Sequence, residues 1–241
     1  MKKSIFLFFI LCMVFSVSSC KDESPYEPKG AIETTKLETL DFRKINVSDE
    51  IKVYVSKSPE TSVLLTTFDD VYDKLNIYSD GTTLFAANSS SYDLSGIQIT
   101  LNVELNDFSE LNIFDNAQIN LKTDFSSSDD LYINTFDNSN FLGKITGKDL
   151  FISSSDNSYV TVFGDFEEVN IISSDNSVVD LSSALIDKTN LSAKDNCKIN
   201  IKTIGDIKVT AKNMSTINVF GGNVVEVDID TSATINYVTK K

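Results

Sequence analysis

The sequence predicts an all-β protein, a single-stranded parallel β-helix with right-handed coils and an N-terminal β-meander as a cap. Three observations predict this fold. A short motif recurs seven times in the second half of the chain, at intervals of 22, 19, 19, 20, 18 and 18 residues. Branched apolar residues alternate with polar residues on both sides of each copy. A repeat this short cannot bury its own apolar face, so neighbouring copies must stack on one another.

The first residues of the chain have the composition of a secretion signal. Lys2 and Lys3 precede an almost unbroken apolar run over residues 5–17, and small residues follow it up to Cys20. The apolar run is too short to span a bilayer comfortably. It therefore favours a cleaved signal peptide over residues 1–19 rather than an anchor helix.

The residues around the expected cleavage site resemble two signals of bacterial lipoproteins. Residues 17–20, Val-Ser-Ser-Cys, resemble the lipobox, which implies that Cys20 becomes the lipidated first residue of the mature chain. An ordinary signal peptide with an incidental cysteine is the alternative. Lys21, Asp22 and Glu23 resemble the surface-export signal of Bacteroidetes lipoproteins. Both resemblances imply an outer-membrane lipoprotein held by several acyl chains and exposed at the cell surface, with a periplasm-facing protein as the alternative.

A tether and one domain follow the expected anchor. Residues 20–36 contain two of the three prolines, a glycine and many charges, which is typical of a flexible tether between membrane and domain. The remaining residues, 37–241, are enough for one large all-β domain. In this interpretation residues 37–100 form N-terminal strands or a cap, and residues 101–238 form the repeat coils.

Longer strands and one hairpin are expected before the repeats. The strands are predicted over residues 40–47, 50–55 and 62–66. Residues 75–78 and 83–85 flank Ser-Asp-Gly-Thr at 79–82, which is a hairpin signal. We expect this region to cover the N-terminal edge of the solenoid, because an open edge invites aggregation.

Each repeat is centred on an Asp-Asn pair or on a substitute for it. The pairs are Asp115-Asn116, Asp137-Asn138, Asp156-Asn157, Asp175-Asn176 and Asp195-Asn196, and the substitutes are Asn213-Met214 and Thr231-Ser232. We predict that each pair forms a structural corner between two strands. The Asn is expected at positive φ, and the Asp is expected to bond its own backbone as an Asx turn. Stacking then places five carboxylates in a row, where solvent screens them or a ligand binds them.

The strands on both sides of a corner determine which residues face the core. Positions two, four and six after each Asp are mostly small or branched apolar residues, and polar residues lie between them. Ile199 is therefore expected to point inward and its neighbour Lys198 outward. The equivalence of the copies gives parallel stacking at about 4.8 Å per coil. A leucine-rich repeat, the competing solenoid, needs a helical or irregular segment and a Leu/Asn frame that the sequence lacks.

Composition excludes several classes of function. Without residues 1–19 the chain has 19 basic and 35 acidic residues, a net charge of −16, which opposes binding to nucleic acid and to anionic lipid headgroups. The absence of histidine excludes Ser-His-Asp and Cys-His catalysis and imidazole metal sites. Cys197 stands two residues after an Asp, where other copies have Ala or Ser, so we interpret it as a core residue and not a nucleophile. We expect no cofactor and no bound metal.

The layout resembles a known family, the head GIN domain of Bacteroidetes envelope proteins, also called the putative auto-transporter adhesin domain. The resemblance covers about residues 37–238. It begins with Leu-Asp-Phe-Arg-Lys-Ile-Asn-Val at 40–47 and continues through the strand at 48–55 and the Asp80-Gly81 hairpin into the repeated corners. In the corners Asp-Asn-Ser replaces the Ser-Gly-Ala-like residues of the family. The resemblance implies a β-helical domain at the cell surface or in the periplasm, with no established activity and no catalytic residues to carry over.

Three functions are compatible with these observations. The first, which we predict, is a non-enzymatic adhesin, binding or scaffolding module whose partner is a surface glycan or a protein. The second is a carbohydrate-active enzyme with paired carboxylates, for which the candidates are Asp129, Asp130, Glu167, Glu168 and Asp180. The third is a calcium-stabilised rod with the Asp row as ligands, although the Gly-Gly-x-Gly-x-Asp frame of calcium β-rolls is missing. Solvated turn charges and structural turns account for the carboxylates of the second and third.

Overall fold

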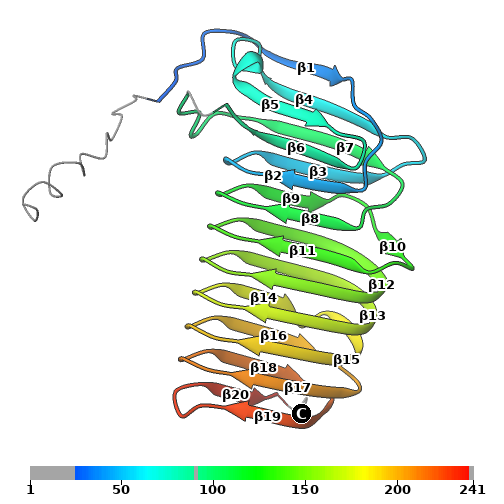
Figure 1. Cartoon of the computed structure of the whole chain (residues 1–241), viewed down its shortest axis with the longest axis vertical. Helices are drawn as coiled ribbons and strands as arrows, with labels where there is room; N and C mark the ends of the chain where they lie inside the picture. Colours follow the sequence, from blue (N-terminus) through cyan, green and yellow to red (C-terminus); the bar gives the residue numbers. More distant parts are fainter. Residues whose placement is uncertain (1–24, 90–91, 239–241) are drawn as a thin grey trace, which may run out of the picture.

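The computed structural model describes residues 25–89 and 92–238, which form an elongated stack of β-coils (Figure 1). The stack has β1 at one end and β19 and β20 at the other. The parallel stacking of the coils confirms the predicted all-β solenoid. Within the described residues there is no α-helix, and one 3-10 turn, η1, covers Tyr72–Lys74. The expected signal peptide, the lipidation site Cys20 and the export signal Lys21, Asp22 and Glu23 lie outside the described residues.

Two sheets face each other across the core. Sheet A consists, in spatial order, of β1 (Ile32–Leu37), β4 (Ser62–Phe68), β7 (Thr100–Leu105), β3 (Lys52–Lys57), β9 (Gln118–Leu121), the first parts of β12 (Asn140–Ser154) and β13 (Tyr159–Ser173), β14 (Val178–Leu181), β16 (Lys198–Lys202), β18 (Thr216–Phe220) and β20 (Thr234–Tyr237). Sheet B consists of β5 (Leu75–Ser79), β6 (Thr83–Asn88), β2 (Lys44–Val47), β8 (Glu110–Ile113), β11 (Leu131–Thr135), the last parts of β12 and β13, β15 (Ala184–Ala193), β17 (Asp206–Ala211) and β19 (Asn223–Ile229). The short strand β10 (Phe125–Ser127) pairs with the middle of β12.

Equivalent positions of successive coils lie directly beside one another. In sheet A, Val160 is paired with Val179, Val179 with Ile199, and Ile199 with Ile217. All four side chains are buried, whereas Lys198 is exposed. The inward register expected from the position after each Asp is therefore confirmed.

The position two residues after each Asp adds a hydrogen bond to this core. The buried hydroxyl of Ser158 donates to the carbonyl of Thr135 at 3.1 Å, and that of Ser177 donates to the carbonyl of Ser154 at 3.0 Å. Cys197 is buried, as expected of a core residue, and its Sγ lies 3.3 Å from the carbonyl oxygen of Ser173. Burial raises the pKa of the Cys197 thiol, which disfavours the nucleophilic thiolate. These bonds satisfy polar groups that would otherwise be buried without partners.

The N-terminal region contains both a coil and a cap. The strand β2 pairs with β6 on one side and β8 on the other, and β3 pairs likewise with β7 and β9. The coil formed by β2 and β3 therefore lies inside the stack, between strands that follow it in sequence. The predicted hairpin is confirmed as the antiparallel pair β5 and β6. Beyond the coils, β4 runs antiparallel to β7, and β1 runs antiparallel to β4, which closes this end.

The described part of the segment expected to be a tether differs from that expectation. The strand β1 (Ile32–Leu37) pairs along its whole length with β4. The hydroxyl of Tyr26 donates to Oδ2 of Asp70 at 2.9 Å, and its backbone N–H donates to the carbonyl of Asp93 at 2.8 Å. Nearly all β1 side chains are exposed, so backbone pairing forms this strand and no apolar alternation marks it in the sequence.

Candidate functional site

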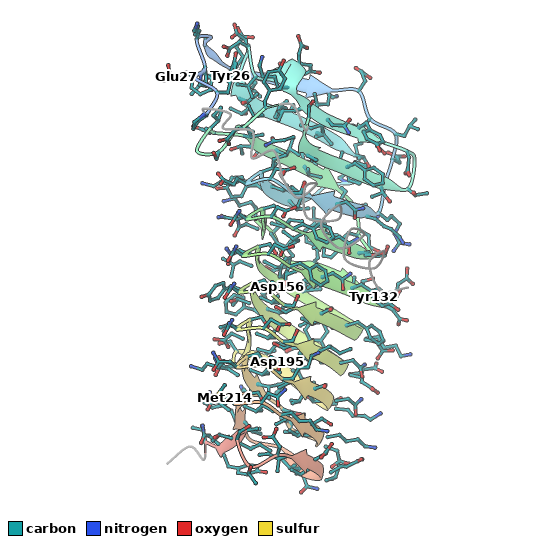
Figure 2. All side chains as sticks on the ribbon, turned by 60° about the vertical axis from the view of Figure 1, so that its left-hand side comes forward. Tyr26, Glu27, Tyr132, Asp156, Asp195 and Met214 are labelled. Atoms are coloured by element: carbon teal, nitrogen blue, oxygen red, sulfur yellow. The ribbon has the colours of Figure 1, made fainter. Side chains whose placement is uncertain are left out.

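The Asp-Asn corners line one edge of the solenoid, where Asp156, Asp195 and Met214 stand one below another (Figure 2). The expected positive φ of the Asn is confirmed, with 60° at Asn157, but the Asp is also left-handed, with 55° at Asp156. The N–H of Ser158 donates to the carbonyl of Ser155 at 3.2 Å across them. Two successive positive φ angles closed by such a bond are those of a type I′ turn.

The Asx turn predicted for each Asp is wrong for the five Asp-Asn corners. Within the described residues, none of these five carboxylates accepts an N–H of its own corner, and that of Asp156 accepts the hydroxyl of Ser155 at 2.5 Å. An Asx turn needs the Asp before the turn, whereas here it occupies the first central position. The last corner does use this device, because Oδ1 of Asp230 accepts the N–H groups of Ser232 and Ala233, each at 2.9 Å. Thr231 and Ser232 accordingly do not have positive φ.

Backbone hydrogen bonds continue the stacking through the corners. The N–H of Asn157 donates to the carbonyl of Asp175 at 2.9 Å, and the N–H of Asn176 donates to that of Asp195 at 3.0 Å. Asn side chains add to this ladder, since Nδ2 of Asn196 donates to Oδ1 of Asn176 at 2.7 Å. The corner residues are therefore brought together as a stacked structural row.

Neighbouring like charges affect the ionisation of one carboxylate in this row. Burial, followed by the charges of Asp137 and Asp49, raises the pKa of Asp115. In the described part of the chain, no group of three or more His, Cys, Asp or Glu side chains is arranged to hold a metal ion.

An eighth corner was missed by the motif because it lacks asparagine. Asp49 and Glu50 both have φ of 61°, and the N–H of Glu50 donates to the carbonyl of Asp115 at 3.0 Å. Val53 and Val55 stand four and six residues after Asp49, which is the spacing of the other copies. That spacing was the signal that could have located this corner.

Two of the five carboxylates considered for catalysis form ion pairs, and the candidates do not all lie on one sheet. Asp129 forms an ion pair with Arg43 at 2.8 Å, and Glu168 forms one with Lys188 at 2.7 Å. The hydrogen bond from Lys188 holds the pKa of Glu168 below its usual range. Glu168 lies on sheet B and Asp180 on sheet A, so they do not flank a common bond of a substrate. Asp130 and Glu167 are exposed at the surface.

Stacked amides and aromatic rings cover the outer face of sheet B near its N-terminal end. Nδ2 of Asn112 donates to Oδ1 of Asn46, and Nδ2 of Asn134 donates to Oδ1 of Asn112, each at 2.7 Å. Two aromatic stacks accompany this amide row. The pairs are Phe114 with Phe136, 5.4 Å between ring centroids, and Tyr132 with Phe151, 4.8 Å. Stacking of the rings in each pair stabilises the sheet, and Tyr132 remains 39% exposed.

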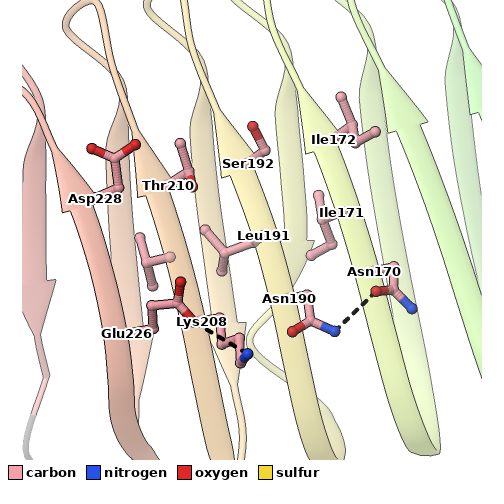
Figure 3. A pocket seen from close by; sticks show the side chains of 11 residues that line it. Asn170, Ile171, Ile172, Asn190, Leu191, Ser192, Lys208, Thr210, Glu226 and Asp228 are labelled. Carbon is pink, nitrogen blue, oxygen red and sulfur yellow. Dashed lines mark hydrogen bonds and ion pairs between the residues drawn. The ribbon is translucent and has the colours of Figure 1, made fainter.

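A groove of about 400 Å³, the sheet B groove, crosses the outer face of β13, β15, β17 and β19 (Figure 3). Its outward-facing side chains are mainly polar: Asn170, Ile172, Asn190, Ser192, Lys208, Thr210, Glu226 and Asp228. Nδ2 of Asn190 donates to Oδ1 of Asn170 at 3.0 Å, and Nζ of Lys208 lies 3.1 Å from Oε2 of Glu226. Ile172 is 62% exposed and is a large apolar group on this surface. The groove thus offers polar groups at regular intervals beside one apolar contact.

Comparison with known proteins identifies the family. The sequence pattern of the family described as "Putative auto-transporter adhesin, head GIN domain" matches residues 41–230. The chain belongs to this family. No curated protein matches it.

Solved structures show the same fold as this head GIN domain. A putative adhesin from Bacteroides fragilis NCTC 9343 is 12% identical with a TM-score of 0.79, and the match covers 89% of this chain and 100% of that chain. A putative lipid binding protein from Parabacteroides distasonis ATCC 8503 is 16% identical with a TM-score of 0.72, covering 90% and 100%. A putative adhesin from Parabacteroides merdae ATCC 43184 is 14% identical with a TM-score of 0.66, covering 90% and 99%. These similarities concern the fold of the head GIN domain.

The sheet B groove of the head GIN domain was not located by sequence reasoning. Its residues occupy outward positions before each corner, and their types change from coil to coil, so no motif marks them. The recurrence of Asn at 170 and 190 was the signal available. In the described part of the chain, no helix has the length and apolar character needed to cross a membrane.

Proposed function

We propose that this head GIN domain is the non-enzymatic binding module of a lipid-anchored envelope protein, and that the sheet B groove contacts its partner. The observation that carries the proposal is the groove itself, which crosses four coils and presents amide, hydroxyl, ammonium and carboxylate groups in register. A row of groups repeated at about 4.8 Å suits an extended polymer lying along the solenoid axis, because successive coils then meet successive units of it. The adhesin names of the family and of two similar structures agree with a binding role.

The partner proposed for the groove is a surface glycan or an extended segment of a protein. A net charge of −16 after removal of residues 1–19 opposes nucleic acid and strongly anionic polymers. Asn170, Asn190, Ser192 and Thr210 donate and accept hydrogen bonds, which suits the hydroxyl groups of a glycan or the backbone of a peptide.

The experiment that tests the groove compares two amide rows of the same chemistry on opposite faces. The groove variant carries Asn170→Ala and Asn190→Ala, and the control carries Asn200→Ala and Asn218→Ala, which removes the row on sheet A in which Nδ2 of Asn218 donates to Oδ1 of Asn200. Both variants and the wild type are applied to arrays of surface glycans and to immobilised envelope proteins. The groove variant should lose binding about tenfold or more while the control retains it. Equal binding by both variants, or no partner on any array, contradicts the proposal.

The proposed anchoring is tested separately from binding. Cys20→Ser should release the protein from membranes or stall it as the unprocessed precursor, since acyl chains on Cys20 supply the attachment. Protease added to intact cells should remove the domain if Lys21, Asp22 and Glu23 direct it to the outer surface. A Cys20→Ser protein that stays with the outer membrane after detergent-free washing rules out the lipid anchor.

A further inference from the structure

The last coil leaves inward-facing residues uncovered. Val227 of β19 lies beside Val209 of β17 in register, yet Val227 is 47% exposed and Val209 is 2% exposed. Tyr237 of β20 lies beside Val219 of β18 with the same contrast, 58% against 1%. Among the described residues, which stop at position 238, no element packs on the far side of β19 and β20. We call the surface formed by Val227, Ile229, Ile235 and Tyr237 the end face.

Both strands at the end face have one unpaired edge within the described residues. β19 pairs with β17 and β20 pairs with β18, and no further pairing is present in the described part of the chain. An open edge beside apolar residues is the arrangement that accepts an added strand, because backbone hydrogen bonds and apolar contacts are offered together.

The outward-facing side chains of β19 include two acids, and basic residues pair with them only on the side of the preceding coil. Oε2 of Glu226 lies 3.1 Å from Nζ of Lys208, and Oδ2 of Asp228 lies 3.0 Å from Nζ of Lys212, both from the preceding coil. Both carboxylates nevertheless remain about two-thirds exposed, because nothing described lies on their other flank. The same alternation of acid and base between neighbouring strands occurs at Glu168 and Lys188 inside sheet B. A basic strand beside β19 would place opposite charges on the open flank of Glu226 and Asp228.

We propose that the end face binds an extended segment of another polypeptide, in which Lys or Arg alternates with branched apolar residues, as an added strand on β19. The basic residues lie beside Glu226 and Asp228, and the apolar residues cover Val227 and Ile229. A second copy of this chain fits poorly, because two β19 strands related by a two-fold axis bring Glu226 and Asp228 close to the same acids of the other copy. Glu226 and Asp228 also line one end of the sheet B groove, whereas Asn170 and Asn190 belong to the other end. The Asn170 and Asn190 variant and the Glu226 and Asp228 variant therefore test the two proposals separately.

The test measures binding of labelled synthetic octapeptides to the full chain by fluorescence anisotropy. The probe alternates Lys and Val. One control peptide alternates Glu and Val, and another has the composition of the probe arranged as Lys-Lys-Val-Val. The alternating Lys-Val peptide should bind at least tenfold more tightly than either control, because only it matches both the charge and the two-residue period of β19.

Matched variants locate the site. Glu226→Lys with Asp228→Lys should weaken the Lys-Val peptide about tenfold or more and strengthen the Glu-Val peptide. Asp165→Lys with Asp187→Lys makes the same change of net charge at exposed positions away from β19 and should leave both peptides unchanged. These four positions are exposed or lie at a solvent-facing edge, and thermal melting checks that each variant folds. Equal binding of the three peptides, or equal effects of the two variants, overturns the proposal. So does a dimer in sedimentation that Val227→Asp abolishes, because the end face would then bind a second copy.

Discussion

The two ends of this solenoid are built from the same kind of strand and differ in how the stack is terminated. At the N-terminal end, β4 and β1 turn antiparallel and cover the first coils, so Val63 and Leu65 of β4 are buried. At the C-terminal end the last parallel coil is itself the surface of the described residues, and Ile229 is 42% exposed although its position is inward. Burial in a solenoid is therefore a property of the neighbouring coil rather than of the residue's place in the repeat. The same substitution should consequently have different costs at the two ends and in the middle.

The largest difference is expected for a charge placed at an inward position. Ile199→Asp buries an unpaired carboxylate in the middle of the stack and should cost more than about 4 kcal/mol, enough to prevent folding. Val227→Asp places the same group at the end face, where water reaches it, and should leave a folded protein. Lys198→Asp, one residue from Ile199 on the outer face, is the control and should cost less than about 0.5 kcal/mol. Circular dichroism and urea unfolding measure all three, and equal tolerance of Ile199→Asp and Lys198→Asp would refute the inward register.

A truncation at each end gives the next largest effect. Leu65→Ala removes buried methyl groups from the N-terminal cap and should lower the free energy of unfolding by about 2–5 kcal/mol. Ile229→Ala removes a similar group from the end face and should cost less than about 1 kcal/mol, because much of that side chain is already in water. Urea unfolding of the two variants gives both values. Similar losses would mean that the end face is covered in solution.

Substitutions at the corners should have smaller effects, and they compare an Asp-Asn corner in the middle of the stack with the last corner. Asn157 has a φ of 60°, so Asn157→Val should cost about 1–2 kcal/mol, whereas Asn157→Gly should be nearly neutral. Thr231 of the last corner does not have positive φ, and Thr231→Val should change the stability by less than about 0.5 kcal/mol. Melting temperatures of the three variants make the comparison. A costly Thr231→Val with a tolerated Asn157→Val would reverse the assignment of the two turn types.

The smallest effects are expected from pH, and they have opposite signs at two corners. The N–H of Asn213, followed by the hydroxyl of Ser232, lowers the pKa of Asp230 to about 2. Its stabilisation is therefore present above the unfolded pKa and lost as pH falls towards 2, so Asp230→Asn should lower the melting temperature at pH 7 and not at pH 2. The pKa of Asp115 is raised in the folded protein, so its protonated carboxyl group favours folding. This contribution is fully present below the unfolded pKa and is lost as pH rises through the folded pKa. Asp115→Asn should raise the melting temperature slightly at pH 7, and a fall there would contradict the unfavourable burial of this carboxylate and its repulsion by Asp137 and Asp49.

The repeat could be predicted from the sequence because it results from the conformational preferences and burial of residues that are close together in the chain. Branched residues at alternate positions, such as Ile199 and Ile201, require a half-buried strand, and the Asn of each pair tolerates positive φ. The second positive φ, at the Asp, was not readable, because Asp in a turn is equally compatible with an Asx turn. β1 was missed because its pairing with β4 joins distant backbone groups and requires no pattern of side chains. The sheet B groove was missed for the same reason, since Asn170 and Thr210 become neighbours of one surface only through stacking.

The path of the chain through the N-terminal region, where an early coil lies between later strands, determines the order in which the coils can form. The coil of β2 and β3 is made early in the chain, but its two edges are covered by β6 and β7 on one side and by β8 and β9 on the other. One edge of this coil is covered once residues up to 105 have been synthesised, and the other only once residues up to 121 have been synthesised. From β11 onward each coil pairs with the one before it and can be added as it emerges. The first half of the chain must therefore close as one cooperative unit with long loops, and the second half can elongate on it one coil at a time.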